Sequence, residues 1–253
     1  MHLTSLRSAG VHLPPGRMTA SDGGHGSRRH LWLSDGPVTG DLWGRICGAH
    51  AASGLWPLLL LSADDDNGAF RPWATGELRP EDMSWPDDHD APALLATWWR
   101  RHASDAEDAA PAWPGLTPAP AERSDADVMA AEYAEIFTEE YPQARLGLVE
   151  APRSADTLTA LGWAGPSPHE SDTAKYSAVL RSWEDRFEAR VVALSDTTLF
   201  LSIAAPPTTE AEALTTAAEH FAVAPTTIRK AAPDLPTYAQ QLIDINNWEL
   251  SWA

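Results

Sequence analysis

The chain contains 253 residues, with 36 acidic and 18 basic side chains, so its formal net charge at neutral pH is -18. Because phosphate contacts need a basic footprint, this charge argues against a nucleic-acid-binding protein and against electrostatic attachment to a membrane surface. A single cysteine, Cys47, excludes an internal disulfide framework and a four-cysteine zinc site. No apolar run approaches the length of a signal-peptide core or a membrane span, and we therefore expect a cytoplasmic protein.

The first part of the chain divides into an irregular lead-in and a patterned lobe. Residues 1–27 carry Gly, Pro, Ser and His without periodicity, which predicts a disordered lead-in, and Met18 is a second candidate for the start of the chain. Residues 28–104 predict an N-terminal α/β lobe. Its expected elements are a strand at 29–34, a helix at 41–52, a buried strand at 55–61, a turn at 64–68 and a helix at 91–102.

An acidic, proline-rich stretch at residues 105–124 predicts a linker or a long surface loop. Residues 125–253 then predict a C-terminal α+β domain. Its helices are expected at 126–140, 154–161, 172–188, 208–222 and 235–245, and its strands at 144–149, 190–194, 198–204 and 248–252. From the first of these strands onward the order is β-α-α-β-β-α-α-β, which predicts a mixed β-sheet with helices packed on it. In the helix at 126–140 the apolar spacing predicts a buried face of Met129, Tyr133, Ile136 and Phe137.

The most distinctive segment is R-S-W-E-D-R-F-E-A-R at 181–190, which covers the end of the helix expected at 172–188 and reaches the strand expected at 190–194. Its helical spacing turns Trp183 and Phe187 toward the core and leaves a dense set of charged side chains. These candidates for a functional surface are Arg181, Glu184, Asp185, Arg186 and Arg190, joined by His220 from a later helix. One interpretation is an ion-pair network that ties helix to sheet. The other is a recognition surface or an acid–base site.

A second set of candidates for acid–base or metal chemistry is Asp87, Asp88 and His89, with His102 on the following helix. The alternative is a solvated loop, since acidic residues are favoured before a helix N-terminus in any case. Cys47-x-x-His50 has half of a zinc spacing without a second pair, which is also typical of a small buried thiol. Nucleotide-binding and hydrolase signatures are absent, so the sequence predicts no cofactor and no bound metal.

Four segments carry a resemblance to a known family. They are L-R-S-W-E-D-R-F-E-A-R at 180–190, L-S-I-A-A-P-P-T-T at 201–209, A-A-E-H-F at 217–221 and W-E-L-S-W at 248–252. The stretch 144–252 resembles an uncharacterised bacterial domain-of-unknown-function family that is common in actinobacteria. Members of that family often carry Phe-Cys-Pro after the E-H-F element, where this chain has Val223, Ala224 and Pro225. The resemblance implies a fold unit and transfers no catalytic residue.

Three hypotheses for the function follow. The net charge, the 12 tryptophans and the lack of a catalytic template favour an acidic protein-binding or regulatory module, of the immunity-protein or antitoxin kind, that recognises a basic protein. The first alternative is a metal-dependent or acid–base enzyme that uses His89 or His220 with neighbouring carboxylates. The second is an accessory structural domain whose acidity only keeps it in solution.

Overall fold

A single mixed sheet of seven strands runs through the part of the chain that the computed structural model describes, which is residues 3–20, 29–63, 67–103, 112–167 and 169–253. The strand order is β1-β2-β4-β3-β5-β6-β7. The strands are β1 (Gly16–Ala20), β2 (Arg29–Pro37), β3 (Leu55–Leu60), β4 (Arg145–Glu150), β5 (Ala189–Leu194), β6 (Thr198–Ile203) and β7 (Asn247–Ser251). Neighbours are antiparallel except β3 and β5, which are parallel. The predicted α+β class with a mixed sheet is confirmed.

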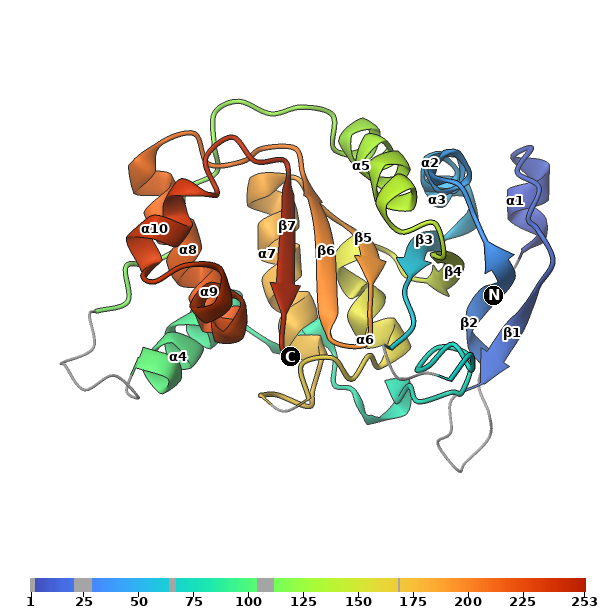
Figure 1. The fold of residues 1–253 in the computed structure, drawn as a ribbon, viewed down its shortest axis with the longest axis horizontal. Coiled ribbons are helices and arrows are strands. Elements are labelled where there is room, and N and C mark those ends of the chain that lie inside the picture. The colour runs from blue at the N-terminus through green and yellow to red at the C-terminus, as the bar shows by residue number, and fades with distance from the viewer. Residues whose placement is uncertain (1–2, 21–28, 64–66, 104–111, 168) are drawn as a thin grey trace.

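Ten α-helices and three short 3-10 helices surround this sheet in the described residues. The α-helices are α1 (Thr4–Ser8), α2 (Gly40–Gly48), α3 (His50–Ser53), α4 (Ala91–Ala103), α5 (Ala126–Glu140), α6 (Thr157–Leu161), α7 (Ala174–Phe187), α8 (Glu210–Val223), α9 (Pro225–Ala231) and α10 (Leu235–Gln240). The 3-10 helices are η1 (Pro80–Asp82), η2 (Pro86–Asp88) and η3 (Ser154–Asp156). Helices α4, α8, α9 and α10 gather at the β7 end of the sheet, whereas α1, α2 and α3 lie at the β1 end (Figure 1). The predicted helices do not include α1 or α9, and the helix predicted at 41–52 is divided into α2 and α3.

The two predicted halves of the chain contribute strands to the same sheet, because β4 lies between β2 and β3. The parallel pairing of β3 with β5 is short and joins only Leu59 with Ala193 and Leu60 with Leu194. Beyond it the indole of Trp56 bridges the two strands, since its Nε1 donates to the carbonyl oxygen of Val191 at 2.8 Å. A buried tryptophan thus satisfies a strand carbonyl where the regular ladder ends.

The prediction of disorder over residues 1–27 is wrong for residues 3–20. This segment forms α1 and β1, and β1 pairs with β2 along its length. Leu6 and Val11 are buried in a small apolar cluster with Trp32 and Ile46. The pairing with β2 and this cluster stabilise a segment that has no periodicity of its own, so a local pattern could not reveal it.

The stretch predicted as a linker or surface loop is partly buried. Its residues 105–111 lie outside the described residues, and so do residues 64–66 of the turn expected at 64–68. Residues 112–124 have no regular secondary structure, but Trp113 and Leu116 pack against the core and Thr117 is fully buried. This part of the stretch is therefore packed against the domain. None of the described helices is long and apolar enough to cross a bilayer.

The predicted buried face of α5 is only partly confirmed. Phe137 is buried and Tyr133 packs against the core, but Ile136 is 59% exposed, and the other buried residues of the helix are Ala126, Ala130 and Ala134. The reason is the close approach of α2, which requires small side chains on the facing surface of α5. A Cβ atom on Gly40 would lie 2.4 Å from the Cα of Glu135, so the crossing needs glycine at this position.

We expect Gly40→Ala to destabilise the fold by about 1–3 kcal/mol, because the added methyl group would overlap the backbone of α5. Gly48→Ala is the matched control in the same helix, since a Cβ there meets nothing within 4 Å. This control should leave stability unchanged or raise it by up to about 1 kcal/mol, as alanine favours helix. Urea unfolding followed by circular dichroism measures both. Equal stability of the two variants would contradict the close crossing.

Candidate functional site

The predicted charged residues of α7 form ion pairs with the segments that surround the helix. Arg181 lies between two carboxylates, with its Nη1 2.6 Å from Asp87 Oδ1 and its Nε 2.6 Å from Asp156 Oδ1. Asp156 belongs to η3 and is almost fully buried. One arginine therefore links η2, η3 and α7.

A second group of charges lies further along the same helix. Glu184 accepts from Arg153 Nε at 3.3 Å and lies 3.7 Å from Arg190 Nη1. Burial raises the pKa of the Glu184 carboxyl, and Arg153 and Arg190 oppose this shift. Arg153 also pairs with Asp185, and Arg190 Nε is 2.9 Å from Asp127 Oδ1 on α5.

The third ion pair is the most buried. Both carboxylate oxygens of Glu219 bind the guanidinium of Arg186, at 2.8 Å and 2.6 Å. Glu219, on α8, is fully buried and also accepts from Trp183 Nε1 and from the backbone N–H of Thr117. Arg186 donates to the Thr117 carbonyl oxygen as well. This cluster joins α7, α8 and the 112–124 segment.

The five charged residues predicted in the 181–190 segment, four on α7 and Arg190 on β5, thus all form internal ion pairs, which favours the structural interpretation over a recognition surface. His220 is separate from these pairs. It is fully buried between Trp183 and Trp248, its Nδ1 lies 3.0 Å from Tyr238 Oη, and its Nε2 has no partner among the described residues. Burial lowers the pKa of His220 to about 3, so the ring is neutral at physiological pH.

The second predicted set does not gather in one place. His89 Nε2 lies 2.7 Å from Ser84 Oγ, which donates to Asp172 at 2.7 Å. Asp87 pairs with Arg181, Asp88 is exposed on η2, and the His102 ring faces His169 and Phe221. His89, His102 and His220 therefore contact three different groups of side chains, although enzymatic chemistry would need at least two of the predicted groups to converge.

Cys47 and His50 do not form a joint site. Cys47 is buried, and burial raises its pKa to about 12, so the thiol stays protonated. His50 Nε2 lies 2.8 Å from the carbonyl oxygen of Ala151. No group of three or more His, Cys, Asp or Glu side chains that could hold a metal ion occurs among the residues that the structure describes.

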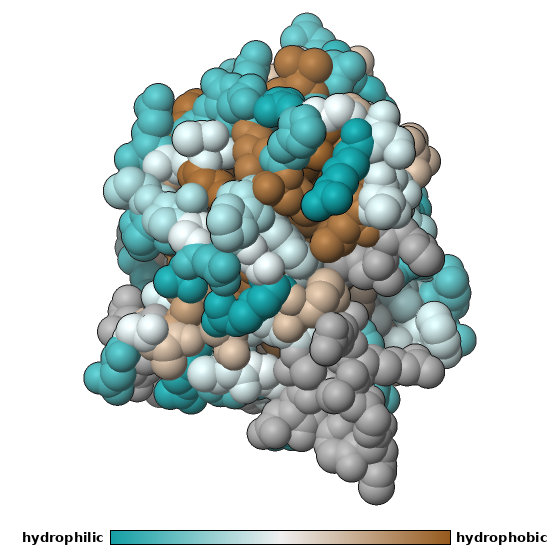
Figure 2. Space-filling view, turned by 90° about the vertical axis from the view of Figure 1, so that its right-hand side faces the viewer, coloured by the Kyte–Doolittle hydropathy of each residue, from teal (hydrophilic) through white to brown (hydrophobic). Residues whose placement is uncertain are grey.

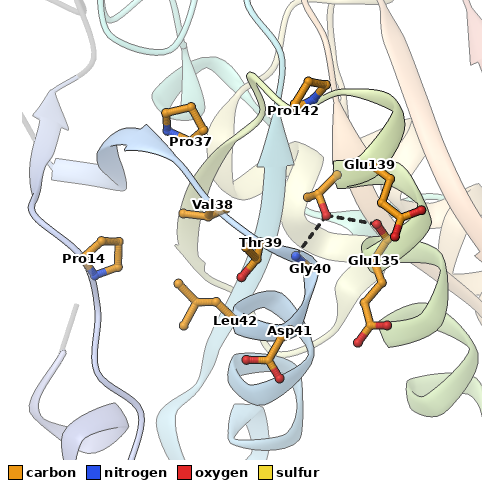
Figure 3. Close-up of a pocket in the computed structure, with 11 residues that line it drawn as sticks. Pro14, Pro37, Val38, Thr39, Gly40, Asp41, Leu42, Glu135, Glu139 and Pro142 are labelled. Carbon is orange, nitrogen blue, oxygen red and sulfur yellow. Dashed lines mark hydrogen bonds between the residues drawn. The ribbon is translucent and has the colours of Figure 1, made fainter.

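Sequence reasoning missed a groove of about 730 Å³ between the start of α2 and the second half of α5 (Figure 3). Its lining residues are Pro14, Pro37, Val38, Thr39, Gly40, Asp41, Leu42, Glu135, Thr138, Glu139 and Pro142. The walls are held together at Gly40, whose N–H donates to Thr138 Oγ1 at 3.0 Å, while that hydroxyl donates to the Glu135 carbonyl oxygen. Three prolines, a valine and a leucine give the groove a rigid, largely apolar surface.

Three carboxylates surround this apolar surface, from Asp41, Glu135 and Glu139. The nearest cation to Asp41 is Arg45 at 3.9 Å. Glu135 and Glu139 form no ion pair with any part of the chain that the structure describes, in contrast to the paired carboxylates around α7. The groove therefore offers negative charge that is available to a ligand from outside.

A second hollow, of about 680 Å³, adjoins the groove and shares Pro14 with it. Leu3, Leu13 and Trp32 contribute to its lining, with Arg7 and His12 as its basic groups. Figure 2 shows apolar side chains gathered on this face of the molecule, which carries α1 and β1, among charged ones. Contiguous apolar surface of this kind is typical of interaction sites.

An acidic stretch at 81–90 offers a different surface. Its Trp85 is 75% exposed, more than any of Val128, Ile136, Leu214 and Ile245. This stretch contains five carboxylates, namely Glu81, Asp82, Asp87, Asp88 and Asp90. Tryptophan is enriched at binding hot spots, but a hot spot is normally part of a packed, desolvated patch.

Comparison with known proteins gives one match. Residues 145–253 match the model of a family described as "Domain of unknown function (DUF4253)". No curated protein and no solved structure matches the chain. The matched segment begins at β4 and includes α6 to α10, so it supports the expected resemblance to a family of unknown function. Asp41, Glu135 and Glu139 precede that segment, and the groove lies outside it.

Removal of the buried charge at Glu219 should be costly. We expect Glu219→Gln to destabilise the fold by about 3–5 kcal/mol, because Arg186 would be left buried without a compensating charge. Asp185→Asn is the matched control, since this carboxylate is 67% exposed in its ion pair with Arg153. Its loss should cost less than about 1 kcal/mol. Chemical unfolding of both variants tests the difference, and similar losses would contradict the burial of the Glu219 pair.

His220 should make stability depend on pH. The unfolded chain protonates this ring near its ordinary pKa of 6.5, whereas the folded chain does so only near 3. The contribution of the neutral His220 ring to the free energy of unfolding is therefore complete above pH 6.5. It is lost as the pH falls toward 3, and the free energy of unfolding decreases by at most about 1.4 kcal/mol per pH unit over this range. His220→Phe should reduce this slope. The NMR signals of the His220 ring should not titrate near neutral pH in the folded protein, and a midpoint near 6.5 would rule out the mechanism.

Proposed function

We propose that this chain is a protein-binding module whose α2–α5 groove holds a basic segment of a protein partner. The observation that carries the proposal is an apolar groove flanked by Glu135 and Glu139, which form no ion pair among the described residues, and by Asp41, whose contact with Arg45 is long at 3.9 Å. Lys and Arg side chains can lay their aliphatic stems along prolines and leucine while their charged ends reach the surrounding carboxylates. Asp41, Glu135 and Glu139 are spread over two walls, which suits an extended segment with more than one cation.

The overall charge supports the same kind of partner. A net charge of -18 attracts a basic protein over a distance of several ångströms and raises the rate of encounter. Salt should weaken the complex, because exposed carboxylates are screened within about 10 Å at 0.1 M ionic strength. A module of this type would act by covering the basic functional surface of its partner, as an immunity protein or an antitoxin does.

The binding hypothesis has better support than the enzymatic one. The histidines that the enzymatic hypothesis requires contact different groups, and His220 is enclosed in the core as a neutral ring. The groove, in contrast, has the volume, rigidity and charge that recognition needs. The exposed acidic stretch around Trp85 is a second candidate surface for the same partner, and the experiment therefore separates the two surfaces.

A pull-down with matched charge variants provides that test. Wild-type protein is compared with a groove variant that carries Asp41→Asn, Glu135→Gln and Glu139→Gln. The control variant carries Glu122→Gln, Glu210→Gln and Asp244→Asn, at exposed carboxylates outside the groove, and it has the same net charge as the groove variant. Each is incubated with host lysate at low and high salt, and the retained proteins are quantified by mass spectrometry.

We expect a stoichiometric basic protein on the wild type and on the control variant, its loss from the groove variant by a factor of about ten, and its release by salt. Equal loss from both variants would mean that only net charge matters and would contradict a specific site. A Trp85→Ala variant is tested in the same way. If it no longer retains the basic protein while the groove variant does, the binding site is the acidic stretch at 81–90. A lysate without any retained basic protein would contradict the binding hypothesis itself.

A further inference from the structure

A cluster of basic side chains lies at the other end of the sheet from the groove, where α4, α8 and α9 meet (Figure 1). Arg101, near the end of α4, donates from Nη1 to the carbonyl oxygen of His169 at 3.4 Å. The ring of His102 lies 5.9 Å from the ring of His169 and 6.3 Å from that of Phe221. The guanidinium of Arg229, on α9, lies over the same Phe221 ring at 5.7 Å.

The two arginines differ from most arginines of the described chain. Those at 17, 45, 71, 123, 153, 181, 186 and 190 each lie within 4.0 Å of a carboxylate. Arg101 and Arg229 form no such pair within the described residues, although the chain has twice as many acidic as basic side chains. Glu170, a nearby acidic group on the same loop as His169, already accepts from Lys175 Nζ at 2.7 Å.

These contacts place both arginines around His169, since Arg101 bonds its carbonyl oxygen and Arg229 lies over the Phe221 ring, which the His102 ring joins to His169. Burial lowers the pKa of the His169 ring, and the positive charges of Arg229 and Arg101 lower it further. Like charges that lie close together with no carboxylate partner among the described residues raise the free energy of the folded chain. An anion placed between them would remove this repulsion and would gain charge-assisted hydrogen bonds.

We propose that Arg101, Arg229 and His169, with His102 beside them, form a binding site for a phosphate-type oxyanion. Guanidinium groups present paired N–H donors that match the oxygens of phosphate, and both side chains are exposed and therefore accessible. The half-buried ring of Phe221 lies against Arg229 and His102, so an ester that carries an aromatic group has an apolar surface to contact. This site does not depend on the proposed function of the groove.

NMR titration of the full-length protein tests the site with two probes, inorganic phosphate and phenyl phosphate. Both should give saturable shifts of the His169 and His102 ring signals at millimolar concentration. Arg101→Gln and Arg229→Gln should each weaken binding by about tenfold. Arg123→Gln is the control, because Arg123 is an exposed arginine whose carboxylate partner, Glu188, is at 2.7 Å. It should bind as the wild type does.

The pKa of His169 gives an independent readout. It should rise in sulfate relative to chloride at equal ionic strength, since a bound dianion stabilises the protonated ring. Tighter binding of phenyl phosphate than of phosphate would identify an esterified ligand, and equal binding would identify free phosphate. Shifts that do not saturate, or an equal effect of Arg123→Gln, would overturn the site.

Discussion

The close crossing of α2 and α5 is the constraint on which the proposed function depends. Gly40 has no side chain, so the first turn of α2 can rest on the backbone of α5, where a Cβ atom would lie 2.4 Å from Glu135 Cα. The hydrogen bond from Gly40 to Thr138 then fixes the two walls relative to each other. Because this contact is rigid, the prolines and carboxylates of the groove keep their positions before any partner arrives, which reduces the entropic cost of binding. The acidic wall of α5 is exposed for the same reason: its alanines, not its larger apolar residues, face α2 and the sheet.

The distribution of ion pairs separates structural charges from charges that are available for binding. Around α7 the arginines and carboxylates neutralise one another, and the Arg186–Glu219 pair is additionally shielded from solvent. Such pairs position α7 against its neighbours, and removal of one partner costs more than the pair contributes. The groove and the Arg101–Arg229 cluster are opposite in character, since each presents charges of one sign. In an acidic chain the two regions would attract different ligands, a basic protein segment at one end of the sheet and a small oxyanion at the other.

The sequence was sufficient for elements with a clear local signal. The apolar stripes of α4 and α7, and the strands at 55–61 and 190–204, lie within a few residues of their predicted positions. The α1–β1 segment was missed because the pairing of β1 with β2 and the small cluster around Leu6 stabilise it, and neither leaves a periodic pattern. The groove was missed because its residues come from three separate segments, at 14, 37–42 and 135–142, that only the folded sheet brings together. The charged segment of α7 was recognised as a cluster, but its spacing could not show that its partners were Asp156, Asp127 and Glu219.

The most direct test of the central claim is an NMR titration of the isotope-labelled protein with a short synthetic peptide of lysines, arginines and prolines. The account predicts saturable, salt-sensitive shifts of backbone amides at 38–42 and 135–141, the two walls of the groove. Shifts concentrated at 81–90 around Trp85, or spread evenly over the acidic surface without saturation, would contradict the assignment of the groove as the binding site.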